Sequence, residues 1–593
     1  MVKDGLDTEL DRELSDLPPE LRWREWMRRI EAVLFASASP VPREDLARVV
    51  GQGASVDLLV EDLAADLEGR AFEIAQVAGG WIFRTRAAYA PAIRAAGGVP
   101  FEVRTTAVSD FITGAARQGS YILGGRDLIP NDIEAQVEAA MLDGMVCLTS
   151  CDKTPPGHLM AAMRLNIPTL LVIGGYQASG MIDGDHVDVE DLFSGGIGET
   201  LGRKGKHSVD AMTRQAIRGP GVCAGMATAN TMHSVVEALG MCIAGSAPVR
   251  ANSDKMFDAA RAAGTRIVDM VKEDLTPRQI MTPGAFRNAA AMVQAVSGSI
   301  NAIKHLQSTA TEGGLDIDLF DIWEEMGRKV PILTAVRPSG HRRIEEFEDA
   351  GGARAMLKQL EPVLDTSAVV ASGRTMGEDL ADAEVLDSEV IRPLDNPVAD
   401  GPAICILKGS LAPESAVVKL GIPDGKRPES FRGPARVFES TEAAMTAIEN
   451  GELQKGEVLV LRGQGLKGGP AMGGGASFVL FAIDAAGLAR DVAFVTDGQL
   501  SGLCLKGLTV AEVSPESAVG GPIGKVRDGD VIDIDVASRK LDVDVPADQL
   551  KGREGPGAEH AVPAEGWLAM YRRDVQPMAT GAVLLDLDHK QEG

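Results

Sequence analysis

The sequence predicts an α/β protein: a parallel-sheet α/β domain and a β-rich C-terminal domain, preceded by a small winged-helix domain. Three helical patterns and then a hairpin pattern occupy the first hundred residues. Strand-like runs alternate with helical ones as far as about residue 365, and short β-branched runs dominate after about residue 393. We therefore expect an acidic tail at 1–20, a winged helix at 21–96, an α/β domain at 97–365, a linker at 366–393 and a β-rich domain at 394–593.

The N-terminal elements are indicated by apolar residues at helical spacing and then by alternation around a Gly-Gly turn. The predicted helices and hairpin cover 21–38, 41–50, 56–67 and 72–85. Three helices followed by a hairpin are typical of a winged helix. In the next domain, buried strands are expected at 144–149 and 169–174, each followed by glycines and a helix. The β-rich domain is indicated by runs at 403–407, 457–461, 491–495 and 530–536.

The charge balance excludes broad classes of partner. The formal net charge is −26, from 59 basic and 85 acidic residues, and this argues against direct nucleic-acid binding.

No apolar run is long enough to span a membrane, and the acidic N-terminus lacks the apolar segment of a secretory signal. Six cysteines without framework spacing predict reduced thiols in a cytoplasmic protein.

A thiol, a carboxylate and an amine stand side by side in Ser150-Cys151-Asp152-Lys153. The motif follows a predicted buried strand, and α/β sheets bind ligands at the carboxyl ends of their strands. A thiolate there suits a soft metal and a carboxylate suits a hard one. The alternative is a turn that contains an incidental cysteine.

Three glycine-containing loops are further candidates. Cys223 lies between glycines before a helix, where the backbone can approach a bulky group; the alternative is a buried thiol. Ser501 follows a strand in Thr496-Asp-Gly-Gln-Leu-Ser-Gly and could act as a base beside a Lewis acid; the alternative is a polar turn. The loop 465–475 could cradle an anionic substrate.

Residues 97–551 resemble the dihydroxy-acid and 6-phosphogluconate dehydratase superfamily, which includes sugar-acid dehydratases. The matching segments follow the family's order and spacing: Gly97-Gly-Val-Pro-Phe with Val108-Ser-Asp110, the Cys151 and Cys223 segments, the Ser501 segment, and Val513-Ser-Pro-Glu-Ser. The resemblance implies a hydro-lyase that converts a 2,3-dihydroxy acid, branched-chain or sugar-derived, into a 2-keto acid.

The resemblance also implies roles for particular residues. Cys151 and Cys223 would be ligands of an iron–sulfur cluster, with [2Fe–2S] favoured over [4Fe–4S]. Asp110 and Asp152 would bind Mg²⁺, together with Lys153 after its carbamylation. Ser501 would be the alkoxide that removes the C2 proton. Family members form dimers or tetramers, so a homodimer or homotetramer is expected.

Two features depart from the family pattern. The family's first cluster cysteine lies in an upstream Pro-Cys-Asn segment, whereas no cysteine precedes Cys147 here. Cys147 lies about 13 Å along the strand from Cys151, too far to replace it. The family's Mg²⁺-binding glutamate aligns with Gly474, which has no side chain. The first feature predicts a labile cluster and weak or no dehydratase activity.

Residues 22–95 resemble the segregation and condensation protein B family, on Ile30-Glu-Ala-Val-Leu-Phe and on 72–86. That family binds a kleisin in a chromosome-condensing complex, so a kleisin-type partner is implied. Residues 1–96 carry 12 basic and 17 acidic residues, which favours protein binding over DNA binding. The alternative to a fused dehydratase is therefore a catalytically inactive fusion that acts as a protein-binding subunit of a chromosome segregation complex.

Overall fold

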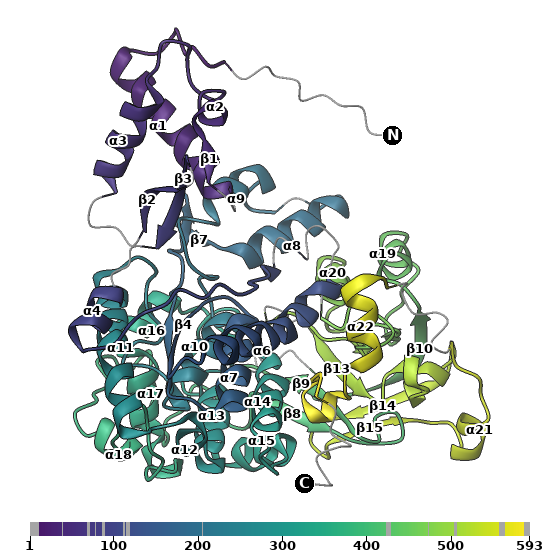
Figure 1. Ribbon diagram of the computed structural model, residues 1–593. Helices are drawn as coiled ribbons and strands as arrows, with labels where there is room; N and C mark the ends of the chain where they lie inside the picture. The colour runs from purple at the N-terminus through teal and green to yellow at the C-terminus, as the bar shows by residue number, and fades with distance from the viewer. Residues whose placement is uncertain are drawn as a thin grey trace. The chain divides into compact units, whose positions relative to one another are not determined.

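The computed structural model describes residues 11–585 except 38–39, 68–71, 78, 86–88, 111–112, 114–118, 204, 423–427, 473, 503–506 and 557–563. The chain divides into two compact units, residues 1–100 and 101–593. Figure 1 labels the helices and strands. Among the described residues, every helix is too short or too polar to cross a lipid bilayer.

The first unit combines helices with a small antiparallel sheet. Its elements are α1 (Pro19–Ala36), β1 (Val41–Pro42), α2 (Arg43–Leu46), α3 (Val56–Asp66), β2 (Phe72–Val77), β3 (Gly80–Thr85) and α4 (Tyr89–Ala95). The strands stand in the order β1-β3-β2, and β2 and β3 form the predicted hairpin. The order of three helices and a hairpin agrees with the sequence, although α2 is a single turn and β1 adds a short strand. Ile30, Leu46 and Leu59 are fully buried in the core of this unit.

The second unit begins with a largely helical part. Its elements are α6 (Ser120–Ala140), β4 (Met145–Thr149), α7 (Thr154–Leu165), β5 (Thr169–Ile173), β6 (Gly180–Ile182), β7 (Asp185–Val187), α8 (Val189–Thr200), α9 (Val209–Gln215), α10 (Thr228–Ala238), α11 (Asp254–Glu273), α12 (Pro277–Ile280), α13 (Pro283–Ala295), α14 (Asn301–Glu312), α15 (Leu319–Lys329), α16 (Ile344–Asp349), α17 (Gly352–Leu360) and α18 (Met376–Asp379). β4 and β5 pair in parallel, as the sequence predicts. This sheet holds two strands within the described part of the chain. Helices α10, α13 and α14 are buried on nearly every side, a pattern that periodicity alone does not separate from buried strands.

The remainder of the unit is β-rich, as predicted. Its elements are β8 (Ile404–Leu407), β9 (Ser415–Lys419), β10 (Ser430–Phe438), α19 (Thr441–Glu449), β11 (Val458–Leu461), α20 (Gly474–Ala485), β12 (Ala493–Thr496), β13 (Leu508–Ser514), β14 (Val531–Asp535), β15 (Lys540–Val543), α21 (Ala547–Lys551) and α22 (Gly566–Asp574). The strands form one sheet in the order β15-β14-β10-β11-β12-β13-β9-β8, in which β10 to β13 run parallel. Lys408, just after β8, bridges to Lys540 of β15, so the sheet is nearly closed.

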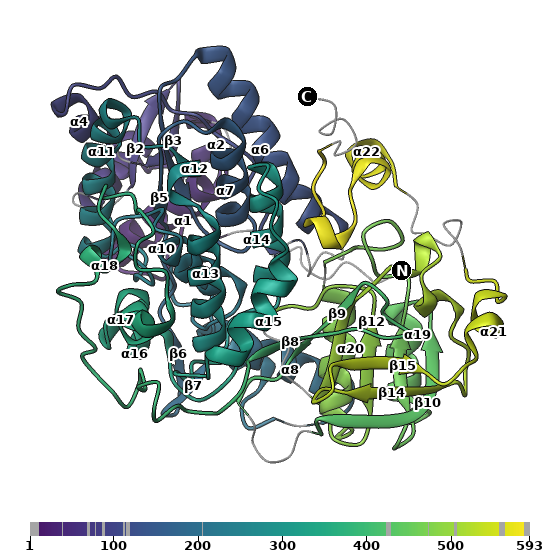
Figure 2. The ribbon, with the colours of Figure 1, turned by 90° about the horizontal axis from the view of Figure 1, so that it is seen from below.

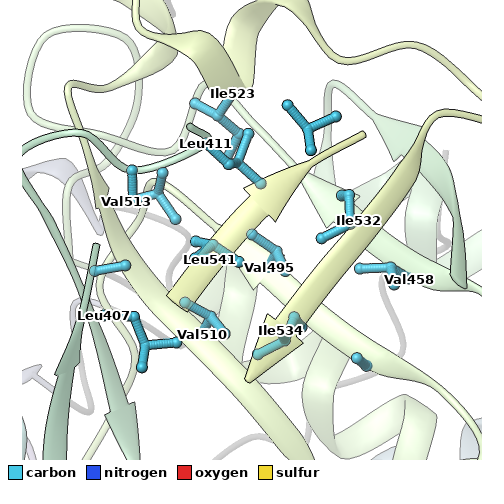
Figure 3. Packing of buried hydrophobic residues seen from close by; sticks show 14 of the residues in the cluster. Leu407, Leu411, Val458, Val495, Val510, Val513, Ile523, Ile532, Ile534 and Leu541 are labelled. Atoms are coloured by element: carbon cyan, nitrogen blue, oxygen red, sulfur yellow. The ribbon is translucent and has the colours of Figure 1, made fainter. Parts of the chain in front are cut away.

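The interior of this sheet is packed with branched aliphatic side chains (Figure 3). Val458, Val495, Val510 and Ile534 are fully buried there. Along β14, buried residues alternate with partly exposed ones, as expected of a strand that covers a core with one face. The packed interior gives the loops at the sheet edge a rigid base.

Parallel pairing determines which loops meet. β11 and β12 pair in parallel, so the loops that begin after Leu461 and after Thr496 leave the same edge of the sheet. Gln499 and Met472 form a bridge between these two loops. Both ribbon views place α15 beside β8, which brings the helical part against the barrel-like sheet (Figures 1 and 2).

Candidate active site

The turn between β4 and α7 carries the central side chains of the site. Cys151 has a left-handed backbone, with φ of 64°, and α7 begins at Thr154 with Pro155 and Pro156 in its first turn. Prolines are favoured there because the first N–H groups of a helix make no intrahelical bond. The turn therefore leaves Asp152 and Lys153 fixed at the carboxyl end of β4, both nearly fully buried.

Asp110, Asp152 and Lys153 converge. Lys153 Nζ lies 2.7 Å from Asp152 Oδ2 and 3.7 Å from Asp110 Oδ2. The other oxygen of each carboxylate, Oδ1, is buried and has no hydrogen-bond partner. Sequence positions 43 residues apart thus form one cluster with two carboxyl oxygens that lack a hydrogen-bond partner.

The two carboxylates influence each other's protonation. Burial, and then the charge of Asp152, raise the pKa of Asp110 well above its usual range. Burial also acts to raise the pKa of Asp152. The charge of Lys153 and the polar side chains around Asp152 outweigh burial and lower this pKa below its usual value. Two carboxylates so crowded favour an added positive charge.

Cys151 and Cys223 lie near this cluster and near each other. Burial raises the pKa of Cys151 to about 12, and the charges of Asp110 and Asp152 add to the effect. Burial and then the charge of Cys151 raise the pKa of Cys223 well above its usual value. The fold therefore brings together the two thiols that the sequence singled out.

The Cys223 loop is held by the groups around it. Asn230 Nδ2 donates to the carbonyl oxygens of Cys223, at 2.8 Å, and of Gly225, at 2.7 Å. Met226 N donates to Arg337 O at 2.6 Å. Three backbone groups near Cys223 thus have fixed partners.

Ser501 is brought to the same region through its neighbour Gly502. A Cβ atom on residue 502 would lie 2.7 Å from Thr228 N and 2.9 Å from Thr228 Oγ1, so glycine is required by the close approach. The Thr228 side chain in turn interacts with the Asp152 carboxylate and lowers its pKa. On the other side, Ser501 N donates to Ser477 Oγ at 2.9 Å. The loop 497–502 thus adjoins the carboxylate cluster.

The glycine-rich loop does not cradle an external anion at residues 466–468. Lys467 N donates to Glu516 Oε1 at 2.7 Å, and the N–H groups of Leu466 and Gly468 also bond this carboxylate. The prediction of an anion cradle is wrong for these residues because the chain's own glutamate occupies their donors. Burial raises the pKa of Glu516 to about 7.

The other described cysteines have different surroundings. Cys147, Cys242 and Cys405 are buried, and none has Cys151 or Cys223 among its electrostatic partners. Cys504 falls in 503–506, outside the described residues. In the described part of the chain, no three His, Cys, Asp or Glu side chains are grouped as metal ligands. The described site therefore supplies two thiols, two carboxylates and one lysine.

Sequence reasoning missed the polar groups that connect the site. No role is predicted from the sequence for Thr228, or for Asn301 and Lys304 in the largely buried α14. The available signal was a run of polar residues, Asn301, Lys304, His305, Gln307 and Ser308, in a helix that the surrounding apolar sequence places inside the protein.

Comparison with known proteins assigns the larger unit. The family model for the N-terminal part of dihydroxy-acid/6-phosphogluconate dehydratases matches residues 83–379, and that for the C-terminal part matches 389–582. The chain belongs to the dihydroxy-acid/6-phosphogluconate dehydratase family. The model for the segregation and condensation complex subunit ScpB matches residues 28–105. Both predicted resemblances are thereby confirmed.

Several relatives of this dehydratase-family chain are named as dihydroxy-acid dehydratases. It is 39% identical over 496 residues to dihydroxy-acid dehydratase 1 of Methanosarcina acetivorans, an alignment that covers 83% of this chain and 89% of the relative. It is 40% identical over 493 residues to dihydroxy-acid dehydratase of Methanothermobacter thermautotrophicus, with the same two shares covered. The enzyme of the same name from Ignicoccus hospitalis is 40% identical over 501 residues.

The family uses Mg²⁺ and an iron–sulfur cluster, and the residues present fit these two groups unequally. The unpartnered oxygens of Asp110 and Asp152 beside Lys153 fit a hard divalent cation. The thiols do not complete a cluster site, because the described residues bring two cysteines together, whereas a cluster normally has protein thiolates on most of its irons.

Stability should depend on pH through Glu516. Its pKa is about 7 in the folded chain against 4.5 for an ordinary glutamate, so the folded state holds the proton more tightly between these values. This contribution, about 3 kcal/mol, is complete below pH 4.5 and is lost as the pH rises through 7. Glu516→Gln should flatten the pH dependence in this window, as measured by urea unfolding followed by circular dichroism. Exposed Glu442→Gln is the control; an equal slope in the Glu516 variant and wild type would contradict the assignment.

Proposed function

We propose that the chain dehydrates a 2,3-dihydroxy carboxylic acid, sugar-derived or branched-chain, to a 2-keto acid. The observation that supports this most strongly is the contact of the Ser501 loop with Thr228, whose side chain interacts with Asp152. This contact puts a hydroxyl-bearing loop beside two carboxylates with unsatisfied oxygens. The names of the relatives support the substrate class.

In this proposal Asp110, Asp152 and a carbamylated Lys153 would hold Mg²⁺. The metal supplies Lewis-acid chemistry, which acidifies the C2 proton of a bound 2-hydroxy acid. The Ser501 oxygen, as an alkoxide, takes that proton. The C2–H electron pair becomes the C2–C3 double bond as the C3–O bond breaks. The departing C3 hydroxide takes the proton back from Ser501 and leaves as water, and the resulting enol tautomerises to the 2-keto acid. Burial of Asp152 and Lys153 keeps bulk water away from the reacting carbon.

Cys151 and Cys223 are proposed as the remaining cluster ligands, with [2Fe–2S] favoured. Since the described residues do not complete the cluster site, no step is assigned to the cluster. A cluster held by two thiolates would be lost readily to oxygen or to a chelator. We therefore propose that the chain retains its proton-abstracting residues while its turnover is impaired.

For the first unit we propose a winged helix, at 21–96, that binds a kleisin-type protein in the cytoplasm. The match to the ScpB model, the order of helices and hairpin, and the acidic balance of residues 1–96 support this. If the dehydratase site is inactive, protein binding would be the role that survives. The remaining domains are proposed at 97–365 and 394–593, joined by a linker at 366–393.

We also propose a defined homodimer or homotetramer. A charge of −26 on each chain opposes non-specific association, so a single species is expected. Light scattering of the purified chain should give a multiple of 62.4 kDa. A monomer at all concentrations tested would contradict the proposal.

Ser501→Ala should abolish residual dehydration, because it removes the proposed base. Formation of 2-keto acid from an aldonic acid and from a branched-chain dihydroxy acid would be followed in anaerobically purified protein. Bound iron should equal that of wild type, since Ser501 is not a proposed cluster ligand. Ser517→Ala, at another buried serine in the short 3-10 helix that follows β13, is the control. Loss of iron in Ser501→Ala would contradict the proton-transfer role.

Because two thiols do not complete the cluster site, the bound iron should be lost readily. Reconstituted chain should hold iron and acid-labile sulfide anaerobically and lose both within minutes of exposure to air or a chelator. Cys223→Ser should hold little iron, whereas Cys242→Ser, a buried cysteine elsewhere, should match wild type. An air-stable cluster, or full turnover on an aldonic acid, would overturn the prediction. Iron-free protein that never turns over would favour the inactive fusion.

A further inference from the structure

The first turn of α14 reaches from the helical part into the loop that carries Ser501. Asn301 and Lys304 are three residues apart and therefore share a face of the helix. Asn301 Oδ1 accepts a short hydrogen bond from Gln499 Nε2, and Lys304 pairs with Glu512. All four side chains are at most 2% exposed. One helix face thus contacts the barrel-like sheet on both sides of Ser501.

The Asn301 side chain also points back to the carboxylate cluster. Its Nδ2 donates to Thr228 Oγ1 at 2.9 Å, and the Thr228 side chain interacts with Asp152. Ser299 Oγ, 2.8 Å from Thr228 Oγ1, completes the surroundings of this hydroxyl. Polar interactions therefore connect Gln499 through Asn301 and Thr228 to Asp152.

The donors in this chain all face the same way. Gln499 donates to Asn301 and Asn301 donates to Thr228, whose side chain interacts with the Asp152 carboxylate and lowers its pKa. Aligned donors in a buried setting polarise one another and favour negative charge at the end of the chain. Because each side chain is buried, removal of any one member leaves a polar group without its partner.

The Lys304–Glu512 pair anchors the same junction from the far side. Glu512 has a left-handed backbone, with φ of 56°, at an irregularity in the pairing of β13 with β9. Its backbone N–H donates to Gly498 O at 3.0 Å, directly beside Gln499. A bulge of this kind redirects a side chain, here toward Lys304.

We propose that Thr228, Asn301 and Gln499 are positioning residues that fix the distance between the Ser501 loop and Asp152. The proposal rests on the proposed function, in which Ser501 and the metal-binding carboxylate act on one substrate carbon. These three residues need not touch the substrate. They hold two parts of the fold, about 350 residues apart in sequence, in one catalytic geometry.

Three variants divide the hydrogen-bonded chain at different points. Thr228→Val removes the hydroxyl beside Asp152, and should weaken Mn²⁺ binding about tenfold. Gln499→Met removes the donor to Asn301, and should speed hydrogen exchange of the 496–502 amides about tenfold with unchanged Mn²⁺ affinity. Asn301→Leu should do both. Mn²⁺ affinity would be measured by electron paramagnetic resonance, and exchange by mass spectrometry.

Two conservative variants guard against misfolding. Thr228→Ser keeps the hydroxyl and should restore Mn²⁺ affinity. Asn301→Asp keeps the acceptor for Gln499 but removes the donor to Thr228, so it should weaken Mn²⁺ binding without speeding loop exchange. Ser308→Ala is the matched control, because this buried hydroxyl of α14 bonds within its own helix. It should alter neither quantity.

The outcomes distinguish the positioning role of these residues from the proposed function of the site. The predicted pattern, with lower residual kcat and similar KM in Asn301→Asp, would support the positioning role. Unchanged exchange in both Asn301→Leu and Gln499→Met would overturn it, as would an equal loss of Mn²⁺ affinity in Gln499→Met and Thr228→Val. If wild type binds no Mn²⁺ and shows no turnover, the proposed function fails, while exchange still decides whether the three residues hold the loop.

Discussion

Asp152 carries a buried negative charge that Lys153, Thr228 and Asp110 together must accommodate. A buried carboxylate is costly unless it is paired and hydrogen-bonded, and each of these partners comes from a different part of the chain. Lys153 is its neighbour in the β4–α7 turn, Thr228 opens α10 beside the Cys223 loop, and Asp110 lies upstream of α6. Satisfying one carboxylate therefore fixes the relative positions of the segments that hold both candidate thiols.

The interactions that hold Asp152 in place extend into the barrel-like sheet. Thr228 approaches Gly502 so closely that no side chain fits there, and Asn301 connects Thr228 with Gln499. The Ser501 loop is a crossover between the parallel strands β12 and β13, and its position depends on these contacts as well as on the strands. Glu516 performs a similar task for the neighbouring glycine-rich loop by accepting its backbone N–H groups. Carboxylates and amides inside the protein, more than the apolar core, set the shape of the catalytic edge.

Local sequence was sufficient for some of these features. Apolar runs and the turn residues that bound them predict the β4 strand, the turn with Cys151, Asp152 and Lys153, and the β-rich region after residue 393. The structure contains all three. Family resemblance identified the candidate residues. The role of Glu516 could not be predicted, because its bonds to Leu466, Lys467 and Gly468 join positions about 50 residues apart. The roles of Asn301 and Gln499 could not be predicted for the same reason. No pattern along the sequence shows that a buried amide has its hydrogen-bond partner 198 residues away.

The central claim is that Asp110, Asp152 and Lys153 form a divalent-cation site directly beside the Ser501 loop. A crystal structure of the anaerobically reconstituted chain soaked in Mn²⁺, with anomalous data collected at the manganese edge, tests this most directly. The account predicts one strong anomalous peak bonded to Asp110 Oδ1 and Asp152 Oδ1, with Ser501 Oγ facing it across the space for a substrate. A peak elsewhere, or no peak while Lys153 stays paired with both carboxylates, would contradict the account.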